Sequence, residues 1–427
     1  MALALLLGFL LVIFIGVPIG FAMGFITIAS FHVLGGNLII IPQRLFSGMD
    51  NFTFLAIPLF ILAAEIMSKG NLIDRIIRFN VSLFGHIPGG LAIVNVMNSV
   101  LFAGISGSAS ADVSALGKIQ IEMMEKAGYP RNYAGAVTAA SAIVTPIKPP
   151  SGIMIIYAVI AGNVSVAAMF VGGFLPAYSL AAIYMVFCYY LAKMRNHPKS
   201  PQRARGIDIW DAFKKAVPVL GCPFIIMGGI MTGVFTATES AVIAVAYALF
   251  ITKFVMKTLE WKALIGCCVR TAKLTANVLF IIAIATAMGW AITTLQIPQA
   301  IVNFSMNYIH SPIVFLLFTN IILIVVGAFM DVSPAMLIMT PILLPAALEF
   351  GIHPLHFGLL ICINLTISLI TPPVGMTLFI TSNVGRIKLS SLYKETLPFA
   401  AVAYIMLMIV TFLPGFTLFL PRLFGYV

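Results

Sequence analysis

The chain has 427 residues, of which 61% are hydrophobic and 9% charged, and its mean hydropathy is +1.10. This composition excludes a soluble globular protein of the same length, because too few polar residues are present to cover an apolar core. The formal net charge of +11 does not indicate nucleic-acid binding, because the basic residues lie in short connections between apolar runs, where they orient a membrane protein.

Apolar runs long enough to cross a lipid bilayer recur along the whole chain. Residues 4–33 are apolar but interrupted at Gly16-Val17-Pro18, so they form either one long tilted helix or two shorter pieces. Residues 34–51 are expected to form a connection, and Phe52–Met67 is the next crossing. Basic residues follow it and place this end in the cytoplasm: Lys69, Arg75 and Arg78.

The next apolar run, residues 91–103, is too short to cross. It reaches about 20 Å, whereas the hydrocarbon core is about 30 Å thick. The run stops at the polar sequence GISGSASAD and returns through residues 111–125 to charged side chains. A run that enters, breaks at a Gly/Ser tip and comes back predicts a re-entrant hairpin over residues 88–126.

Residues 130–160 cross next, with a break at Thr145–Gly152, where Thr-Pro and Pro-Pro interrupt the helix. Residues 166–192 cross back to a basic loop, residues 193–215, which is the strongest cytoplasmic signal in the chain. Three further crossings are expected, at residues 216–236, 239–256 and 274–295.

The second half repeats this pattern. Residues 312–328 enter, break at GAFMDVSP and return through residues 335–348, which predicts a second hairpin over residues 311–349. Residues 355–383 cross with a break at Thr371–Gly375, and residues 398–420 form the last crossing. Because the number of crossings between the two hairpins is odd, the second hairpin is expected to open on the opposite side of the membrane.

Six glycines and prolines match between the halves at one offset, as in 327 − 104 = 223. The pairs are Gly104/Gly327, Gly128/Gly351, Gly135/Gly358, Pro149/Pro372, Pro150/Pro373 and Gly152/Gly375. Inverted repeats with broken helices are typical of secondary transporters, whose binding sites lie at the breaks.

The sequence therefore predicts an all-α polytopic membrane protein with two inverted repeats. Its expected parts are scaffold helices at 1–87, a first repeat at 88–165, scaffold helices at 166–310, a second repeat at 311–385 and a C-terminal scaffold helix at 386–427.

The hairpin tips and helix breaks offer oxygen atoms at membrane depth, where irregular backbone is tolerated only inside protein or beside a wet cavity. Carbonyl and hydroxyl oxygens suit a hard cation such as Na⁺. The candidate Na⁺ ligands are Gly104, Ser106, Thr145, Pro146 and Gly152 in the first repeat, and Gly327, Asp331, Thr366, Thr371, Pro372 and Gly375 in the second. Close packing of small residues between helices is the alternative role for such clusters.

Among the charged candidates, Asp331 stands out, because a carboxylate inside a hairpin tip is costly in a membrane. Its partner at the offset is Ser108. Asp331 would complete a cation site, contact a polar substrate or pair with a nearby base. Lys148 would either attract an anionic substrate or extend to the membrane interface. Asp112 and Glu239 are further candidates with less certain positions.

At these residues the chain resembles the large membrane subunit of tripartite ATP-independent periplasmic (TRAP) transporters. The stretches that carry the resemblance span nearly the whole chain: FLAIPLFILAAEIMSKG, GHIPGGLA, GISGSASADVSALG, PIKPPSGIMIIY, GGIMTGVFTATESAVIAV and TPPVGMTLF. The resemblance implies a multi-pass protein of the bacterial inner membrane with an elevator-type transport domain. It also implies two partners, a small membrane subunit and a periplasmic substrate-binding protein.

The activity that the resemblance implies is uptake of an organic anion driven by two or more Na⁺ ions. A sialic acid is the first expectation and a C4-dicarboxylate the second. The substrate would lie between the hairpin tips, and the expected contacts are Ser106, Ser108, Ser110, Asp331 and Lys148. This chain departs from the pattern at Lys148, because relatives usually have an apolar residue before the paired prolines.

Alternatives from other classes also remain. A proton-coupled anion exporter or antiporter of the same architecture would need titratable groups at both sites, and the first site has only Asp112 and Lys148 nearby. A membrane-embedded enzyme is disfavoured, because the sequence has no HExxH, GxSxG or Walker A motif. A channel fits less well, because paired hairpins suit alternating access better than an open pore.

Overall fold

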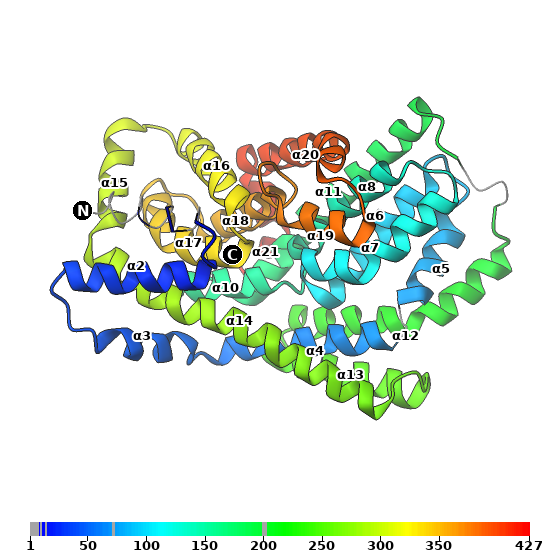
Figure 1. Cartoon of the computed structure of the whole chain (residues 1–427), viewed down its shortest axis with the longest axis horizontal. Coiled ribbons are helices and arrows are strands. Elements are labelled where there is room, and N and C mark those ends of the chain that lie inside the picture. Colours follow the sequence, from blue (N-terminus) through cyan, green and yellow to red (C-terminus); the bar gives the residue numbers. More distant parts are fainter. Residues whose placement is uncertain (1–7, 9–10, 13–14, 71–72, 199–202) are drawn as a thin grey trace.

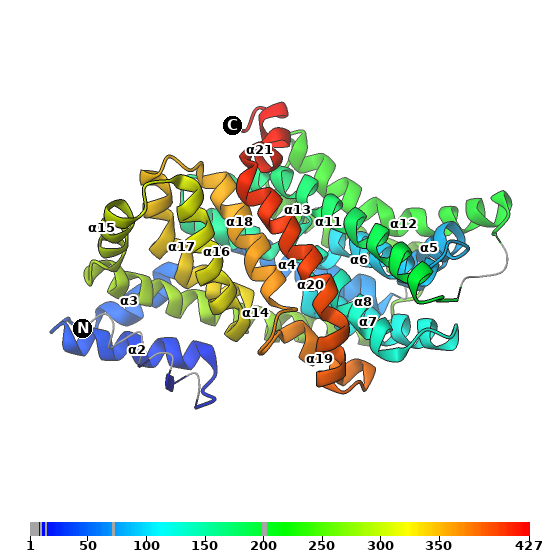
Figure 2. The ribbon, with the colours of Figure 1, turned by 90° about the horizontal axis from the view of Figure 1, so that it is seen from above.

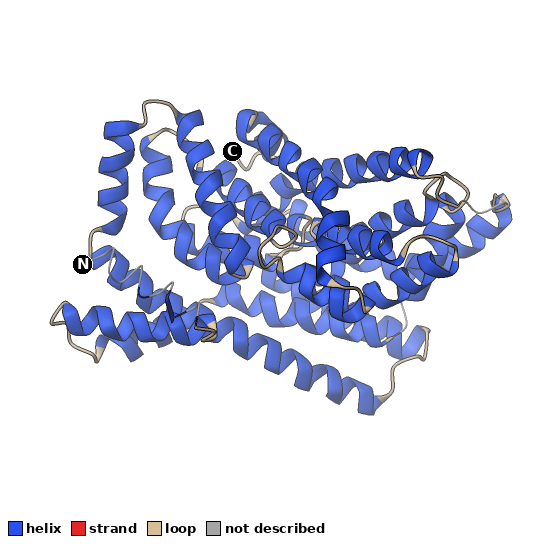
Figure 3. Cartoon of the chain, turned by 45° about the horizontal axis from the view of Figure 1, so that its top comes forward, coloured by secondary structure: helices blue, strands red, loops and turns tan. Residues whose placement is uncertain are grey.

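The computed structural model describes residues 8, 11–12, 15–70, 73–198 and 203–427, and every regular element in this part is a helix (Figure 1, Figure 3). Nine of the described helical segments are long and apolar enough to cross a membrane, by length and composition. The prediction of an all-helical protein with many membrane spans is confirmed. Part of the predicted segment 4–33, and Lys199 in the basic loop, lie outside the described residues.

The N-terminal region differs in detail from the prediction. Helix α2, Ile19–Val33, begins directly after Pro18, so the interruption at Gly16–Pro18 is a helix boundary. Residues 34–51 are more than a connection, because Ile40–Met49 forms helix α3. The proline in α3 is its third residue, where the backbone N–H has no partner within the helix, so the ring costs no hydrogen bond.

One group of helices, the outer layer, runs along the lower edge of Figure 1 and up both sides. Helix α4 packs against α13 and α14, α14 packs against α2 and α3, and α12 packs against α5 and α13. The outer layer consists of α2, α3, η1 (Phe52–Leu55), α4 (Ala56–Lys69), α5 (Ile73–Phe84), α12 (Gly206–Met231), α13 (Ala237–Phe250), η2 (Ile251–Val255), α14 (Trp261–Thr294) and α15 (Ile297–Tyr308).

For two crossings of this layer, the predicted start lies several residues after the start of the helix in the structure. Helix α14 starts at Trp261 rather than at residue 274, and its 34 residues extend for about 50 Å. Helix α12 starts at Gly206, inside the predicted basic loop, where the Asp208 carboxylate accepts a hydrogen bond from the Arg205 backbone N–H at 3.2 Å. Charged residues near a membrane boundary do not stop a helix, so the charge pattern alone set these starts wrongly.

The remaining helices form the inner body. It contains α6 (Gly90–Ser106), α7 (Ala109–Lys126), α8 (Arg131–Ala142), α9 (Val144–Ile147), α10 (Gly152–Ala161), α11 (Val166–Met194), α16 (Pro312–Phe329), α17 (Val332–Glu349), α18 (Pro354–Ser368), α19 (Met376–Gly385), α20 (Leu389–Phe412) and α21 (Pro414–Leu423). Figure 2 shows α20 running across this body, where it packs against α8, α11 and α18. The last crossing was predicted at 398–420 as one run, but it starts at Leu389 and breaks before Pro414.

The offset of 223 residues between the two repeats also applies to the first and last residues of equivalent helices. Helix α7 maps onto α17 at both ends, because 109 + 223 = 332 and 126 + 223 = 349. The start of α11 maps onto the start of α20, because 166 + 223 = 389. The peptide bonds Pro149–Pro150 and Pro372–Pro373 are both cis. The internal repeat therefore extends from single residues to whole elements.

Both hairpin turns are tighter than their polar sequences suggest. Helices α6 and α7 are joined by Gly107 and Ser108 alone, and α16 and α17 by Met330 and Asp331 alone. The flanking serines and glycines remain helical. Gly107 has φ +61°, and a Cβ there would lie 2.6 Å from the Pro150 carbonyl oxygen. The first tip therefore packs its backbone directly onto the break in the helix of the same repeat.

The two helix breaks are present but differ in extent. The first break runs from Lys148 to Ser151, and Thr145 and Pro146 lie in the short helix α9. The second break runs from Leu369 to Gly375. The predicted break at Thr145–Gly152 was therefore too long at its start, because proline is compatible with the first turn of a short helix.

The two repeats meet where Tyr157 of α10 lies over Gly358 of α18. The Tyr157 hydroxyl donates a hydrogen bond to the Pro354 carbonyl oxygen at 2.7 Å, and the tyrosine is fully buried. A Cβ on residue 358 would overlap the Tyr157 ring. Glycine at this position therefore sets the distance between helices of the first and second repeats.

Replacing Gly358 with alanine is expected to lower the melting temperature of the purified protein in detergent. The added methyl group must displace the tyrosine ring or α18, and such overpacking costs about 1–3 kcal/mol. Gly289→Ala on α14 is the matched control, because nothing lies within 4 Å of an added Cβ there. Equal melting temperatures for the two variants would contradict this packing.

Candidate functional site

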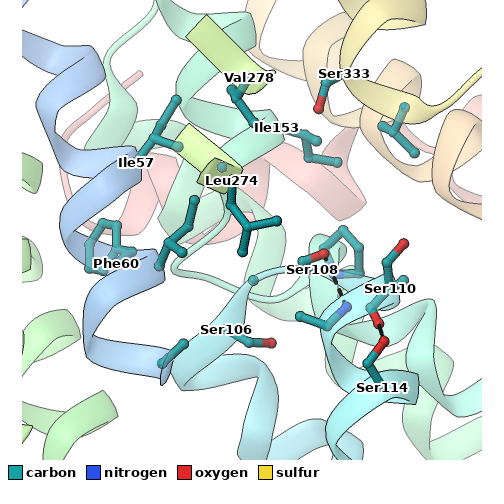
Figure 4. A pocket seen from close by; sticks show the side chains of 18 of the residues that line it. Ile57, Phe60, Ser106, Ser108, Ser110, Ser114, Ile153, Leu274, Val278 and Ser333 are labelled. Atoms are coloured by element: carbon teal, nitrogen blue, oxygen red, sulfur yellow. Dashed lines mark hydrogen bonds between the residues drawn. The ribbon is translucent and has the colours of Figure 1, made fainter. Parts of the chain in front are cut away.

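A cavity of about 730 Å³ lies between the inner body and the outer layer. This volume is within the usual range for a small-molecule site. Both hairpin tips line it, at Ser106–Ala111 and Asp331–Ser333, together with Pro150 and Leu369 of the two breaks and the neighbouring residues Pro146 and Gly152. Figure 4 shows tip serines facing Ile57 and Phe60 of α4 and Leu274 and Val278 of α14. The cavity is thus the place where both repeats meet the outer layer.

The first tip contributes a row of hydroxyl groups to the cavity wall (Figure 4). Ser114 Oγ donates to the Ser110 carbonyl oxygen at 2.7 Å, and Ser108 Oγ accepts a hydrogen bond from the Ala111 N–H at 3.4 Å. Ser106 Oγ is buried and has no hydrogen-bond partner among the described residues. The predicted residues Ser106, Ser108 and Ser110 are therefore brought together, and one of them has a free hydroxyl group.

Asp331 projects from the second tip into the same cavity. It is the N-cap residue of α17, its side chain makes no capping hydrogen bond, and it is exposed. Within the described part of the chain it forms no ion pair. A carboxylate that lines a cavity without an ion-pair partner among the described residues is available to bind a cation or a polar ligand.

Charged residues of the outer layer also line the cavity, and sequence reasoning missed them as site residues. Lys69 and Glu65 lie near the end of α4, and Arg270 and Asn277 lie on α14. Arg270 Nε is 3.6 Å from Glu65 Oε2. Their sequence context is that of ordinary charged residues near helix ends. Only the packing of α4 against α14 brings them to the site.

A buried polar network lies behind the first tip. Asn95 of α6 donates to Thr138 at 2.8 Å and accepts from Ser141 at 2.9 Å, which links α6 to α8. Asp112 of α7 is 1% exposed and accepts a hydrogen bond from Thr145 Oγ1 at 2.7 Å. This bond ties the hairpin to the broken helix. It places Asp112 in the protein interior, outside the cavity lining.

Lys148 was predicted to contact the substrate, but it lies outside the cavity lining. It is 5% exposed. Its Nζ lies about 3.0 Å from where a Cβ on Gly104 would be, and Pro223 of α12 is 2.7 Å from the same point. The ammonium group therefore lies against the last turn of α6, between the inner body and the outer layer.

In the second repeat, several predicted oxygens are used within the protein. Thr366 Oγ1 donates to the Cys362 carbonyl oxygen at 2.6 Å, and Thr371 Oγ1 lies 2.8 Å from the Tyr404 hydroxyl. Gly327 packs closely against Ser368 of α18. Pro372 is exposed. These side chains order the break, which leaves main-chain carbonyls as its available oxygens.

Two such carbonyls converge at Gly375. A Cβ on this residue would lie 3.2 Å from the carbonyl oxygens of both Leu369 and Thr371. Glycine, with φ +61°, lets the backbone approach them. The Leu369 carbonyl oxygen accepts a hydrogen bond from the Thr377 N–H at 3.2 Å, and its second lone pair can still contribute to holding a small hard cation. Leu369 was missed by sequence reasoning, because a main-chain oxygen has no sequence signature.

Glu239, a weaker candidate, has a structural role. It forms a capping box with Thr236 at the start of α13, where its carboxylate accepts hydrogen bonds from the Thr236 N–H at 2.8 Å and hydroxyl at 2.9 Å. Such reciprocal capping satisfies backbone donors at the helix start. This geometry accounts for the residue without a role in transport.

Comparison with known proteins shows matches over nearly the whole chain. The family described as "Tripartite ATP-independent periplasmic transporter, DctM component" matches residues 6–416. The sialic acid TRAP transporter large permease protein SiaM of Vibrio cholerae is 38% identical over 98% of both chains. The C4-dicarboxylate TRAP transporter large permease protein DctM of Pseudomonas aeruginosa is 38% identical over 90% of this chain and 89% of its own.

A solved structure also resembles this chain. The YdaH transporter of Alcanivorax borkumensis aligns over 89% of each chain, with a TM-score of 0.63 and 14% sequence identity. At this identity the likeness concerns the fold alone. It supports an all-helical arrangement of many membrane spans.

The geometry of the cavity predicts which cysteine substitutions react with a polar thiol reagent. In a variant lacking the five native cysteines, Ser110→Cys should react at least about tenfold faster than Ser99→Cys, because reaction requires access to the thiolate. Ser110 lines the cavity, whereas Ser99, on the same hairpin, is 1% exposed. The measurement is the rate of thiol labelling in membranes, followed by mass spectrometry of the labelled protein. Similar labelling rates at both positions would contradict the assignment of Ser110, but not Ser99, to the accessible cavity lining.

Proposed function

The chain belongs to the DctM-component family of tripartite ATP-independent periplasmic transporters, which are multi-pass permeases of the bacterial inner membrane, and we propose that it takes up an organic anion by Na⁺ symport. It is a transporter permease, not an enzyme. The observation that supports the proposal is the set of charges around the cavity.

These charges couple a cation to an anion. Lys69 and Arg270 contribute two positive charges to the lining, and Glu65 and Asp331 two negative ones, so the formal sum is zero. A Na⁺ ion that neutralises Asp331 leaves one positive charge in excess. An anion then gains attraction only after the cation has bound, because opposite charges at close range stabilise each other.

The cation sites lie at the tips and breaks. In the second repeat, the carbonyls beside Gly375 and the carboxylate of Asp331 are oxygen donors that suit Na⁺. In the first repeat, the free hydroxyl of Ser106 is the available side-chain donor. Each Na⁺ that enters down a potential of 100 mV contributes roughly 2.3 kcal/mol to accumulation. Two or more ions would support strong uptake.

The inner body moves as an elevator against the outer layer, and its two repeats have inverted topology. The division expected from the sequence assigned α11 and α20 to the scaffold. We assign both to the moving body, because α11 packs against α6, α9, α10 and α18, and α20 packs against α8 and α18. The cavity then lies on the sliding surface. Movement of the inner body carries both tips and the bound anion together.

The substrate is a carboxylate that also carries hydroxyl groups. The row of tip serines supplies hydrogen-bond partners for hydroxyls, and Arg270 suits a carboxylate. A sialic acid fits this description best, and a C4-dicarboxylate is the second candidate. Relatives named for each of these substrates are 38% identical to this chain, so overall identity does not separate them.

Two partners complete the transporter. A periplasmic binding protein delivers the anion, and a small membrane subunit docks against the outer layer. The alternative, a proton-coupled antiporter, is less favoured. The carboxylate behind the first tip, that of Asp112, is held by Thr145 and does not line the cavity.

Uptake of radiolabelled sialic acid into proteoliposomes is expected to require Na⁺. The vesicles contain this chain, the small membrane subunit and the binding protein. Replacing external Na⁺ with K⁺ should abolish accumulation, because K⁺ is too large for an oxygen site built for Na⁺. A C4-dicarboxylate is tested in parallel. Accumulation driven by a pH gradient without Na⁺ would refute the proposed coupling.

Asp331→Asn should weaken Na⁺ activation of uptake. Removing the only carboxylate of the tips is expected to raise the half-saturating Na⁺ concentration roughly tenfold, which corresponds to about 1.4 kcal/mol. Asp74→Asn on α5 is the control, because Asp74 is exposed and does not line the cavity. An unchanged Na⁺ dependence in Asp331→Asn would remove this residue from the ion site.

A further inference from the structure

Lys148 is a buried cation that has no ion-pair partner in the described part of the chain. Its side chain is 5% exposed. Burying an ammonium group is costly unless its surroundings stabilise the charge. Such a residue inside a membrane transporter calls for a functional explanation.

The internal repeat provides the comparison. The position equivalent to Lys148 is Thr371, because 148 + 223 = 371. The position equivalent to Asp112 is Ala335, because 112 + 223 = 335. The first repeat thus carries one buried positive and one buried negative charge at positions where the second repeat is neutral.

The lysine lies where a bound cation would be stabilised. Its Nζ contacts the region of Gly104, in the last turn of α6, which ends at Ser106. Helix C-termini carry partial negative charge and favour cations. Three residues earlier in the same segment, Thr145 holds the Asp112 carboxylate. Gly104 and Thr145 are both among the predicted Na⁺ ligands of the first repeat.

The first break is also more enclosed than the second. All residues from Thr145 to Ser151 are buried, whereas Pro372 and Pro373 of the second break are exposed. The first break already contains a charge that is covalently attached to the chain.

We propose that the Lys148 ammonium group replaces one Na⁺ ion in the first repeat, so that this transporter couples uptake to one fewer Na⁺ than it would with a neutral residue there. This inference rests on the proposed Na⁺ symport. The tethered charge stabilises the packing of the first tip on its break in every state. Na⁺ then binds at the remaining sites, which include the second tip, where Asp331 lies.

The test compares Lys148→Thr, which installs the residue of the second repeat, and Lys148→Met, which is neutral and of similar length. Lys148→Arg keeps the charge, and Lys262→Thr, an exposed position on α14, is the matched control. The Na⁺-to-anion stoichiometry is measured from reversal potentials in the same proteoliposomes. Each neutral variant is expected to gain one Na⁺ per anion, while Lys148→Arg and Lys262→Thr keep the wild-type value.

Melting temperatures in detergent give a second readout that does not need transport. Both neutral variants should gain a larger stabilisation by Na⁺, relative to N-methylglucamine, than the wild type, because Na⁺ takes the place of the ammonium group. A neutral variant that is folded only in Na⁺ supports the proposal. One that is equally unstable with either cation contradicts it.

The outcomes separate the two proposals. Uptake by the wild type without Na⁺ would refute the symport and, with it, the role of Lys148. A Na⁺-dependent wild type whose neutral variants keep its stoichiometry and its Na⁺ stabilisation would refute the role of Lys148 alone.

Discussion

The structure depends on one constraint, that irregular backbone inside a membrane must find its polar partners within the protein. Each repeat meets this constraint by placing a hairpin tip against a broken helix. In the first repeat, Gly107 brings the tip into contact with the Pro150 carbonyl group, and the Thr145 hydroxyl binds the carboxylate of Asp112. The same polar groups that make the fold possible are those that can bind ions.

The pairing of the two repeats follows from close packing rather than from charge. Tyr157 of one repeat covers Gly358 of the other and donates a hydrogen bond to α18. This contact joins a helix that flanks the first break, α10, to one that flanks the second, α18. The two repeats are therefore packed against each other within one inner body.

The cavity lies at the boundary between these two layers, and both layers contribute polar groups to its lining. The inner body supplies hydroxyls and one carboxylate, and the outer layer supplies Lys69 and Arg270. Neither layer alone supplies both the positive and the negative charges of the cavity lining. The two repeats also differ chemically, since Lys148 gives the first a fixed charge that the second lacks.

The sequence by itself determined the membrane class, the family resemblance and the internal repeat. It also placed the tips close to Gly107 and Asp331, because composition, proline and glycine act locally and leave a pattern along the chain. The predicted starts of α12 and α14 were wrong, because charged segments can continue a helix even where they are exposed. The helix at Ile40–Met49 and the break before Pro414 were not predicted. Only the tertiary structure brought Arg270 and Glu65 to the cavity, turned Lys148 away from it and aligned the carbonyls beside Gly375. These features depend on contacts between distant helices and on main-chain oxygens that every residue has, so no residue pattern records them.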